Sequence, residues 1–298
     1  MRIIDELRPE YDLGELLSIA HMGRSTYYYT RKSMRRDNSN EEALRERIRF
    51  LYEKNTHGNE TYGYRRICLL LRKDAAYSTI NHKKVQKVMH EMGLSGYISR
   101  NGKRYSSYKG RIGKIADNLV QREFDAPKPN TIWSTDITEF KLVSCSNKKV
   151  YLSPIKDFCD GSIISYSCSS SPNLALVMGM LDKALEKNRC LAGLVFHSDQ
   201  GWHYQHPAWT ERLESRCIEQ SMSRKGNCLD NSKMETFFSA LKKAIWFGHE
   251  KEYRSEEELI RRIDEYIKWY NEERIQVKLK GLTPLQYRSK AFKITAHT

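Results

Sequence analysis

The 298-residue sequence lacks any apolar run approaching the ~18–20 residues that a helix needs to cross a bilayer. Its first residues include Asp5, Glu6 and Glu10, where a secretion signal would have an apolar stretch. Cysteines number seven, and no two of them have the Cys-x-x-Cys spacing of a zinc ribbon or redox motif. These absences argue against membrane-spanning, secreted and disulfide-rich classes. They predict a cytoplasmic protein with reduced thiols.

The composition is that of a folded chain with an excess of positive charge. Hydrophobic residues make up 39% and aromatic residues 11%, which is enough to form a core and excludes a mainly disordered protein. The length predicts two or three domains. The 51 Lys and Arg residues exceed the 37 Asp and Glu residues by 14 charges, and residues 1–128 carry 10 of these. A basic front half predicts binding to a polyanion such as nucleic acid, with an ordinary solvated surface as the alternative.

Two short helices are expected near the N-terminus. An apolar face at residues 16–20 is followed by a break at Gly23 and by Ser25, a residue type that favours the start of a helix. A helix, a short glycine turn and a polar aromatic helix are typical of a helix-turn-helix. Tyr27 and Arg31 on the second helix are therefore candidate DNA contacts.

A second helical unit is expected downstream. Apolar residues recur at helical spacing in three segments, 42–54, 62–72 and 80–94, and Gly93 is placed to end the last of them. Near the exposed start of the last segment, side chains that could meet phosphates are Lys83, Lys84 and Lys87. The region 95–129 has little periodicity and a basic first part, and we interpret it as a linker lying along DNA.

The back half has the pattern of an α/β domain. A strand is expected at 131–143 with Asp136 at its centre, and a short buried strand at 191–196 leads directly to Asp199. Between them we expect strands at 150–158 and 162–169 and a helix at 173–188. If the first and last strands pair, the two carboxylates lie side by side. An acid facing solvent on an edge strand is the alternative for Asp136.

A third acid lies on a later amphipathic helix. Residues Met234, Phe237 and Leu241 belong to an apolar stripe, and an adjacent edge carries the polar residues Asn231, Glu235 and Lys242. Hard divalent cations prefer oxygen ligands, and two such ions ~3.5–4 Å apart can stabilise an in-line phosphoryl transfer. Three carboxylates from separate elements could hold them. In isolation, Glu235 could equally be an ordinary helix acid paired with a nearby lysine.

At these residues the sequence resembles the larger reading-frame product (OrfB type) of bacterial insertion sequences of the insertion-sequence-three family. These are DDE transposases with an integrase-type catalytic domain. WSTDITEF resembles the motif of the first Asp, FHSDQGWHYQ that of the second, and SRKGNCLDNSKMETFFSALKK that of the Glu. Thirty-five residues separate Asp199 from Glu235, and Lys242 follows Glu235 by seven positions, as in the family. YGYRRI and HKKVQKVMHEMGL resemble its helix-turn-helix region, and YNEERIQVKLKGLTPLQYR its C-terminal signature.

The resemblance implies a ribonuclease-H-like α/β fold with a mixed five-stranded sheet flanked by helices, preceded by an all-α helix-turn-helix region. The expected domains are an N-terminal helix-turn-helix (1–38), a second helical DNA-binding domain (39–98), a basic linker (99–128), the catalytic domain (129–250) and a C-terminal helix and tail (251–298). Asp136, Asp199 and Glu235 would be the catalytic residues and the ligands of two Mg²⁺ ions, with Mn²⁺ as a substitute. Lys242, Lys225 and Asn231 would contact DNA beside them.

The implied reaction is cleavage at the element ends, followed by joining of the freed 3′-hydroxyl to DNA. The implied partners are the terminal inverted repeats, target DNA, further copies of the chain assembled on DNA, and the upstream-frame (OrfA-type) product, and the implied location is the bacterial nucleoid. Two alternatives remain open from the residues alone. One is a metal-dependent nuclease of the same fold, and the other is a DNA-binding regulator with an inert α/β domain, although all three acids are present.

Overall fold

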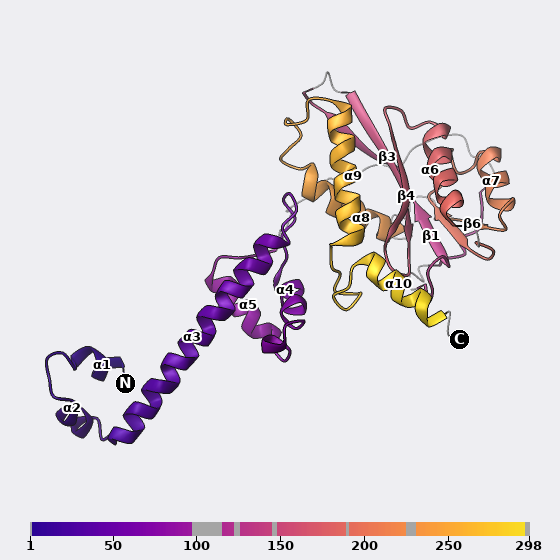
Figure 1. The fold of residues 1–298 in the computed structure, drawn as a ribbon. Coiled ribbons are helices and arrows are strands. Elements are labelled where there is room, and N and C mark those ends of the chain that lie inside the picture. The colour runs from indigo at the N-terminus through magenta and orange to yellow at the C-terminus, as the bar shows by residue number, and fades with distance from the viewer. Residues whose placement is uncertain are drawn as a thin grey trace.

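The chain is described by a computed structural model in which a long helix connects a small N-terminal unit to the rest of the molecule (Figure 1). The structure describes residues 2–96, 115–121, 126–144, 148–188, 191–224 and 231–295. Within these ranges no helix is both long enough and apolar enough to cross a membrane.

The N-terminal unit consists of α1 (Arg2–Leu7), α2 (Leu13–Ile19) and the start of α3 (Arg24–Lys54). A small core forms where Leu13, Leu16 and Leu17 of α2 pack with Ile4 and Tyr27. The sequence predicted separate helices on either side of residue 38, but α3 is a single helix. The expected boundary between residues 38 and 39 therefore falls inside this helix. The reason is local, because the stretch 32–41 contains neither glycine nor proline to interrupt the helix.

The second helical unit packs α4 (Tyr64–Leu71), the short helix η1 (Ala75–Tyr77) and α5 (His82–Glu91) against the C-terminal half of α3. Its core includes Ile48 of α3, Ile67 of α4 and Val85 of α5, all fully buried. Gly93 follows α5 with a φ of 67°, the left-handed conformation that favours glycine after a helix.

The domain that the sequence predicts to be catalytic is built on one mixed sheet. Its strands are β1 (Ile132–Thr135), β2 (Thr138–Leu142), β3 (Lys148–Asp157), β4 (Ile163–Ser169), β5 (Val195–Ser198) and β6 (Glu219–Met222). The order is β2-β3-β1-β5-β6, with β4 also paired to β3. β1 runs antiparallel to β3 and parallel to β5.

β1 and β2 are two parts of one interrupted strand. The pairs Thr135–Ile155 and Thr138–Leu152 continue the same antiparallel register along β3, and β4 occupies the other edge of β3. Six strands therefore fill five positions, in agreement with the predicted five-stranded sheet. The prediction of one continuous strand over 131–143 was wrong at its centre, because the chain leaves the strand at Asp136 and Ile137.

Helices cover both faces of the sheet (Figure 1). α6 (Leu174–Lys187) and α7 (Pro207–Glu214) share one core with Trp133 and Phe196. α8 (Ser232–Ile245) and α9 (Glu256–Glu272) share another with Phe140 and Leu152, and α10 (Pro284–Thr295) follows. The result is the predicted ribonuclease-H-like α/β architecture preceded by helical units.

The second helical unit and the catalytic domain share a continuous hydrophobic core. The backbone N–H of Asn59 donates to the carbonyl oxygen of Ala244 in α8 at 3.1 Å. Gly58 lies so close to that carbonyl that a Cβ atom would be 2.3 Å from its oxygen, and its φ of 57° also favours glycine. The two units therefore meet with direct backbone contact.

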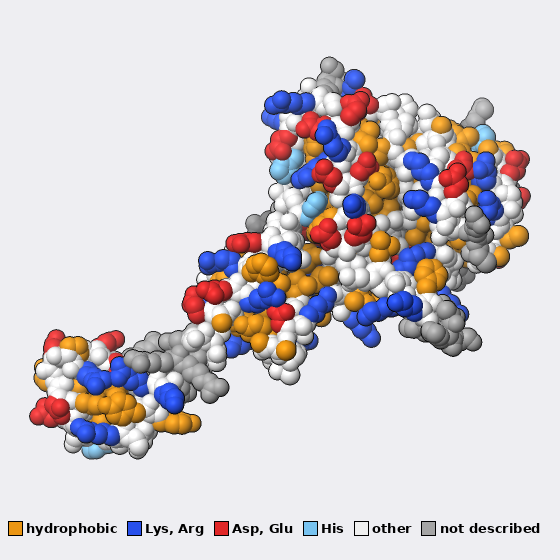
Figure 2. All heavy atoms as spheres, in the orientation of Figure 1, with side chains coloured by type: hydrophobic (Ala, Val, Ile, Leu, Met, Phe, Trp, Pro, Cys, Tyr) orange, Lys and Arg blue, Asp and Glu red, His pale blue; other side chains and the backbone are white. Residues whose placement is uncertain are grey.

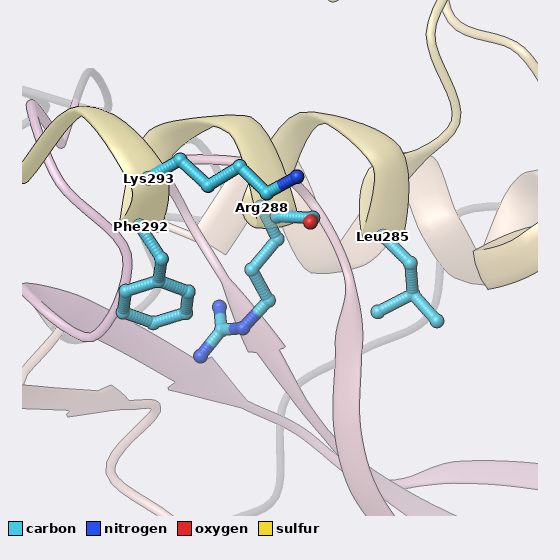
Figure 3. Close-up of a pocket in the computed structure, with 5 residues that line it drawn as sticks. Leu285, Arg288, Phe292 and Lys293 are labelled. Atoms are coloured by element: carbon cyan, nitrogen blue, oxygen red, sulfur yellow. The ribbon is translucent and has the colours of Figure 1, made fainter. Parts of the chain in front are cut away.

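The C-terminal helix is anchored by a buried ion cluster. Arg288 of α10 donates to Asp157 at 2.9 Å and to Asp160 at 2.8 Å, and both carboxylates are fully buried. Arg288 and Phe292 extend from α10 toward the strands beneath it, beside an open hollow of about 510 Å³ (Figure 3). Sequence reasoning did not single out this cluster, which ties the tail to the end of β3.

Candidate active site

Asp136 and Asp199 lie at the ends of neighbouring parallel strands. β1 pairs with β5 through Ile132–Val195 and Ser134–His197, so the residues that directly follow the two strands continue the same alignment. Both carboxylates are half-buried. The prediction that the first and fourth expected strands pair is confirmed, and the two acids directly follow these neighbouring strands.

The turn after β5 holds the Asp199 carboxylate. The backbone N–H of Gly201 donates to Asp199 Oδ1 at 2.9 Å, and a Cβ atom on Gly201 would lie 2.9 Å from the same oxygen. Gln200 donates to the carbonyl of Ser223 at 3.0 Å and accepts, through its own carbonyl, a bond from Gln205. These bonds fix the backbone of the turn, so that Asp199 faces the end of β1.

The two carboxylates share a site poor in compensating positive charge. Burial raises the pKa of Asp136 to about 8, and the charges of Asp199 and Glu235 act in the same direction, against the Ile137 N–H and Lys242. Burial also raises the pKa of Asp199, although the N–H of Gly201 opposes this shift. Two acids that resist ionisation side by side are typical of a functional site rather than a structural one.

Lys242 reaches this site from α8. Its Nζ donates to the carbonyl oxygen of Glu139 at 3.0 Å and lies 5.2 Å from the centre of the Phe140 ring. Burial lowers the pKa of Lys242, and the nearby charges of Glu139 and Asp136 partly offset this effect. A partly buried ammonium group beside the carboxylates is well placed to meet an anionic substrate.

Asn231 ties the start of α8 to β1. It precedes the helix and is buried, with its Oδ1 accepting from Ser134 Oγ at 2.8 Å and its Nδ2 donating to the Thr135 carbonyl at 3.4 Å. Both ends of its amide are therefore turned to the strand that leads to Asp136. The prediction that Asn231 contacts DNA is wrong for this structure, because the side chain is committed to positioning α8.

Glu235 lies in the first turn of α8 and is exposed. Its charge is close enough to raise the pKa of Asp136. In the part of the chain that the structure describes, no three His, Cys, Asp or Glu side chains are grouped closely enough to hold a metal ion. The structure therefore brings Asp136 and Asp199 together with Glu235 nearby, and the convergence of all three on metal stays a prediction.

The remaining predicted DNA contacts have different outcomes. Tyr27 is fully buried, and the hydroxyl donates to Asp5, so this side chain is unavailable to DNA and that prediction was wrong. Arg31 is half-buried, with its Nε 3.4 Å from Asp5 Oδ1. At the start of α5, three lysines are exposed as expected, namely Lys83, Lys84 and Lys87. Lys225 falls outside the described residues.

An ion cluster between the helical unit and the catalytic domain was missed. The Glu60 carboxylate accepts from Arg66 at 2.8 Å and from Arg274 at 2.7 Å, and also from the Tyr266 hydroxyl at 3.1 Å. The Tyr62 hydroxyl accepts the backbone N–H of Ile275 at 3.0 Å. These residues belong to YGYRRI and YNEERI or precede them closely, so the two motifs were visible in sequence, but their contact was not.

Comparisons with known proteins identify the domains. Models described as "Integrase core domain" match residues 126–228 and 235–292, and one described as "HTH-like domain" matches residues 39–102. The catalytic core domain of HTLV-2 integrase is similar at 19% identity and a TM-score of 0.42, over 55% of this chain and 99% of its own. The catalytic core domain of BIV integrase is similar at 12% identity and the same TM-score, over 57% and 99%.

Three bacterial relatives cover most of the sequence. The InsK protein of insertion sequence element IS150 from Escherichia coli K12 is 41% identical over 98% of this chain and 99% of its own. A transposase-like protein of Haemophilus influenzae is 49% identical over 71% and 94%, and the transposase InsF of insertion sequence IS3A from Escherichia coli is 26% identical over 96% and 97%. With its carboxylate pair on an integrase-type sheet behind an HTH-like domain, the chain belongs to the insertion-sequence-three family of DDE transposases.

Proposed function

We propose that this transposase cleaves the ends of its element and joins the freed 3′-hydroxyl ends to DNA by metal-dependent phosphoryl transfer. The observation that carries the proposal is the pair Asp136 and Asp199, aligned at the ends of two parallel strands with Lys242 beside them. Joining, in addition to cleavage, is inferred from family membership. A nuclease that cleaves without joining is the alternative that the experiment below addresses.

The carboxylate pair fits a hard divalent cation. Burial raises the pKa of both acids, and the charges of Asp199 and Glu235 raise that of Asp136 further, so positive charge placed between the carboxylates would relieve an unfavourable interaction. Their ligand atoms are oxygens, which Mg²⁺ prefers and Mn²⁺ also accepts. Asp136 and Asp199 would hold the ions, with Glu235 completing the site from α8. Two Mg²⁺ ions bound there would stabilise the charge that develops on the attacking and leaving oxygens.

The residues of the chain contribute positioning and charge. Lys242 would hold a phosphate oxygen of the cleaved strand, replacing its present bond to the Glu139 carbonyl. Asn231 fixes the first turn of α8, and therefore Glu235, relative to β1. Gly201 allows the Asp199 carboxylate to stay against the backbone of its turn.

The helical units would bring the element ends to this site. On the face shown in Figure 2, Lys and Arg side chains gather on the N-terminal unit, over the bundle of α3 to α5 and near α10. Lys83, Lys84 and Lys87 are exposed on α5 and would contact phosphates of a terminal inverted repeat. Lys225 and Arg31 would add further contacts. The chain would act on the nucleoid as a homo-oligomer assembled on two ends and target DNA, with the upstream-frame product as a further partner.

The test is a cleavage and strand-transfer assay on labelled duplexes of the element ends, with Mg²⁺. Asp136→Asn, Asp199→Asn and Glu235→Gln should each abolish both reactions while leaving duplex binding nearly unchanged. Asp182→Asn is the matched control, because this acid forms a surface pair with Arg212 on α7 and should retain activity. Cleavage without any joined product in the unaltered protein would favour the nuclease. Full activity of any of the three variants would remove that acid from the site.

A further inference from the structure

A hollow of about 500 Å³ lies where the second helical unit meets α8, and Glu235 stands in its wall. One wall is the polar face of α8, which contributes Ser232, Ser239 and Lys243 in addition to Glu235. The other is formed by Arg66 and Arg274, from opposite ends of the sequence. Apart from Glu235, no residue of this hollow has a role at the carboxylate site, and we define the hollow as the joint groove.

The helical repeat explains why α8 has two distinct sides. Met234, Phe237 and Leu241 are buried in the core, whereas residues spaced three or four apart from Ser232 to Lys243 lie along the groove. Glu235 lies on the border between this face and the edge that carries Lys242. α8 therefore carries Glu235 together with two lysines on adjoining surfaces, with Lys242 on the carboxylate side and Lys243 on the groove side.

The charges of the groove favour an anion. Glu60 is the shared partner of Arg66 and Arg274, so one carboxylate faces two guanidinium groups and one positive charge is left over. Each guanidinium has five N–H donors, more than a single carboxylate can accept. Lys243 on the opposite wall adds a third cation, and Glu235 on the same helix adds a second acid, so the lining keeps one net positive charge. The Ser232 and Ser239 hydroxyls between them are neutral donors of the kind that bind phosphate oxygens.

The groove is a fixed part of the molecule. Its two walls are joined by the backbone bond from Asn59 to Ala244, and the two parts of the arginine wall are joined by the bond from Ile275 N–H to the Tyr62 hydroxyl. His57 also stacks on Trp269 of α9, with ring centres 4.6 Å apart and nearly parallel planes. A site preformed in this way spends little binding free energy on ordering its own side chains.

We propose that the joint groove binds the sugar–phosphate backbone of a DNA strand that continues to the carboxylate pair past Glu235. Lys243 and Arg66 would contact phosphate oxygens from opposite sides, and the serines of α8 would donate to the same backbone. DNA is favoured over an acidic protein segment, because Glu235, the proposed third catalytic acid, lines the groove, and because Arg66 in its second wall belongs to the unit that carries the exposed lysines of α5. This inference rests on the proposed function.

The test measures binding of full-length protein to a fluorescent duplex of the element end, without divalent metal, over a range of salt concentrations. Lys243→Gln should weaken binding roughly fivefold at 0.15 M salt and should reduce the salt dependence by about one released ion, because one phosphate contact is lost. Lys268→Gln is the matched control. This exposed lysine of α9 lies outside the groove, so the same loss of charge should leave binding unchanged.

A second variant keeps the test independent of any effect on folding. Thr236→Glu adds a negative charge to an exposed position of the groove face and should weaken binding at least as much as Lys243→Gln. Binding that is unchanged in both variants would overturn the joint groove as a strand site. If Asp136→Asn still abolished cleavage in the same preparation, the proposed function would stand without it. If the unaltered protein failed to cleave DNA while both groove variants still bound the duplex more weakly, the joint groove would stand and the proposed function would be wrong.

Discussion

Glu60 and Arg274, which are 214 positions apart in the sequence, form a buried ion pair with a 2.7 Å contact. Each side chain is 11% exposed, and a second guanidinium from Arg66 shares the carboxylate. The pair joins the HTH-like domain to the segment that follows α9. It therefore fixes the orientation of a DNA-binding unit relative to the helix that carries Glu235.

Replacing Glu60 should destabilise the whole protein. Glu60→Ala leaves the buried Arg274 and the half-buried Arg66 without their carboxylate, and breaking a buried pair in this way costs about 3–5 kcal/mol. Chemical denaturation should show the unfolding midpoint moving to lower denaturant. Glu139→Gln is the control, since Glu139 pairs with Lys149 at the surface and should change stability by less than about 1 kcal/mol. Equal effects of the two substitutions would contradict the role given to Glu60.

The same carboxylate predicts a pH dependence of stability. Burial acts to raise the pKa of Glu60, but the charges of Arg274 and Arg66 outweigh burial and hold it below the ordinary value of 4.5. A lowered folded-state pKa adds stability above the ordinary value, and this stability is lost as the pH falls through the lowered pKa. The gap in unfolding free energy between unaltered protein and Glu60→Gln should be largest near neutral pH and should shrink below about pH 4. If this difference in unfolding free energy grew as the pH fell, the pKa of Glu60 would be raised in the folded protein and not lowered.

The sequence predicted the sheet because the relevant information is local. Buried strands next to Asp136 and Asp199 have strongly apolar, β-branched patterns, and the motifs of the two acids mark their ends. The break at Asp136 was missed because nothing in 131–143 resembles a turn. The break is visible only in the structure, where Thr135 and Thr138 pair with β3 in one register but Asp136 and Ile137 between them belong to no strand.

The side-chain assignments that failed depend on contacts across the fold. Tyr27 was predicted as a DNA contact from its place on a polar aromatic helix, yet Asp5 of α1 accepts its hydroxyl and the core of the N-terminal unit buries its ring. Asn231 was predicted to contact DNA because it lies on the same helix edge as Glu235 and Lys242. In the structure its side-chain oxygen instead accepts a hydrogen bond from Ser134, 97 positions away in the sequence. Periodicity gives the face of a helix, but it does not say which element covers that face.

Asn231 should prove necessary for cleavage without touching DNA. Asn231→Ala leaves the buried Ser134 hydroxyl without its acceptor, at a cost of about 1–3 kcal/mol, and loosens the start of α8. Cleavage should fall strongly while duplex binding is retained. A double-mutant cycle with Ser134→Ala should give a coupling free energy of about 0.5–3 kcal/mol. Additive effects in the cycle, or a loss of DNA affinity equal to the loss of cleavage, would count against positioning.

Arg288 should anchor the C-terminal helix through charge. Arg288→Met leaves Asp157 and Asp160 buried without a cation, which should cost about 3–5 kcal/mol and lower the thermal midpoint. Adding Asp160→Asn to this variant should recover part of the loss, since it removes one of the two buried charges. The control Arg212→Met breaks a surface pair with Asp182, so it should change stability by less than about 1 kcal/mol. No recovery in the double variant would mean that Arg288 acts by packing alone.

Gly201→Ala should impair catalysis more than stability. The new methyl group would lie 2.9 Å from Asp199 Oδ1 and 3.3 Å from the Tyr204 ring, closer than carbon atoms normally approach either group. The carboxylate is the more mobile neighbour, because Tyr204 is buried, so the clash should turn Asp199 away from Asp136. A misplacement of about 1 Å at a reacting group can cost roughly 100-fold in rate. We therefore expect cleavage to fall by about that factor, with duplex binding retained.

The control is Gly179→Ala, in the interior of α6. A Cβ atom there would meet Ser167 Oγ at 3.7 Å, an ordinary contact, and alanine in a helix is favoured over glycine by about 0.5–1 kcal/mol. This variant should be slightly more stable and fully active. The thermal midpoint of Gly201→Ala should stay within a few degrees of the unaltered protein, because the strained contact lies in the turn that follows β5 and not within the sheet. Normal cleavage by Gly201→Ala would show that Asp199 tolerates a shift, and that the contact between this turn and the carboxylate does not set its catalytic position.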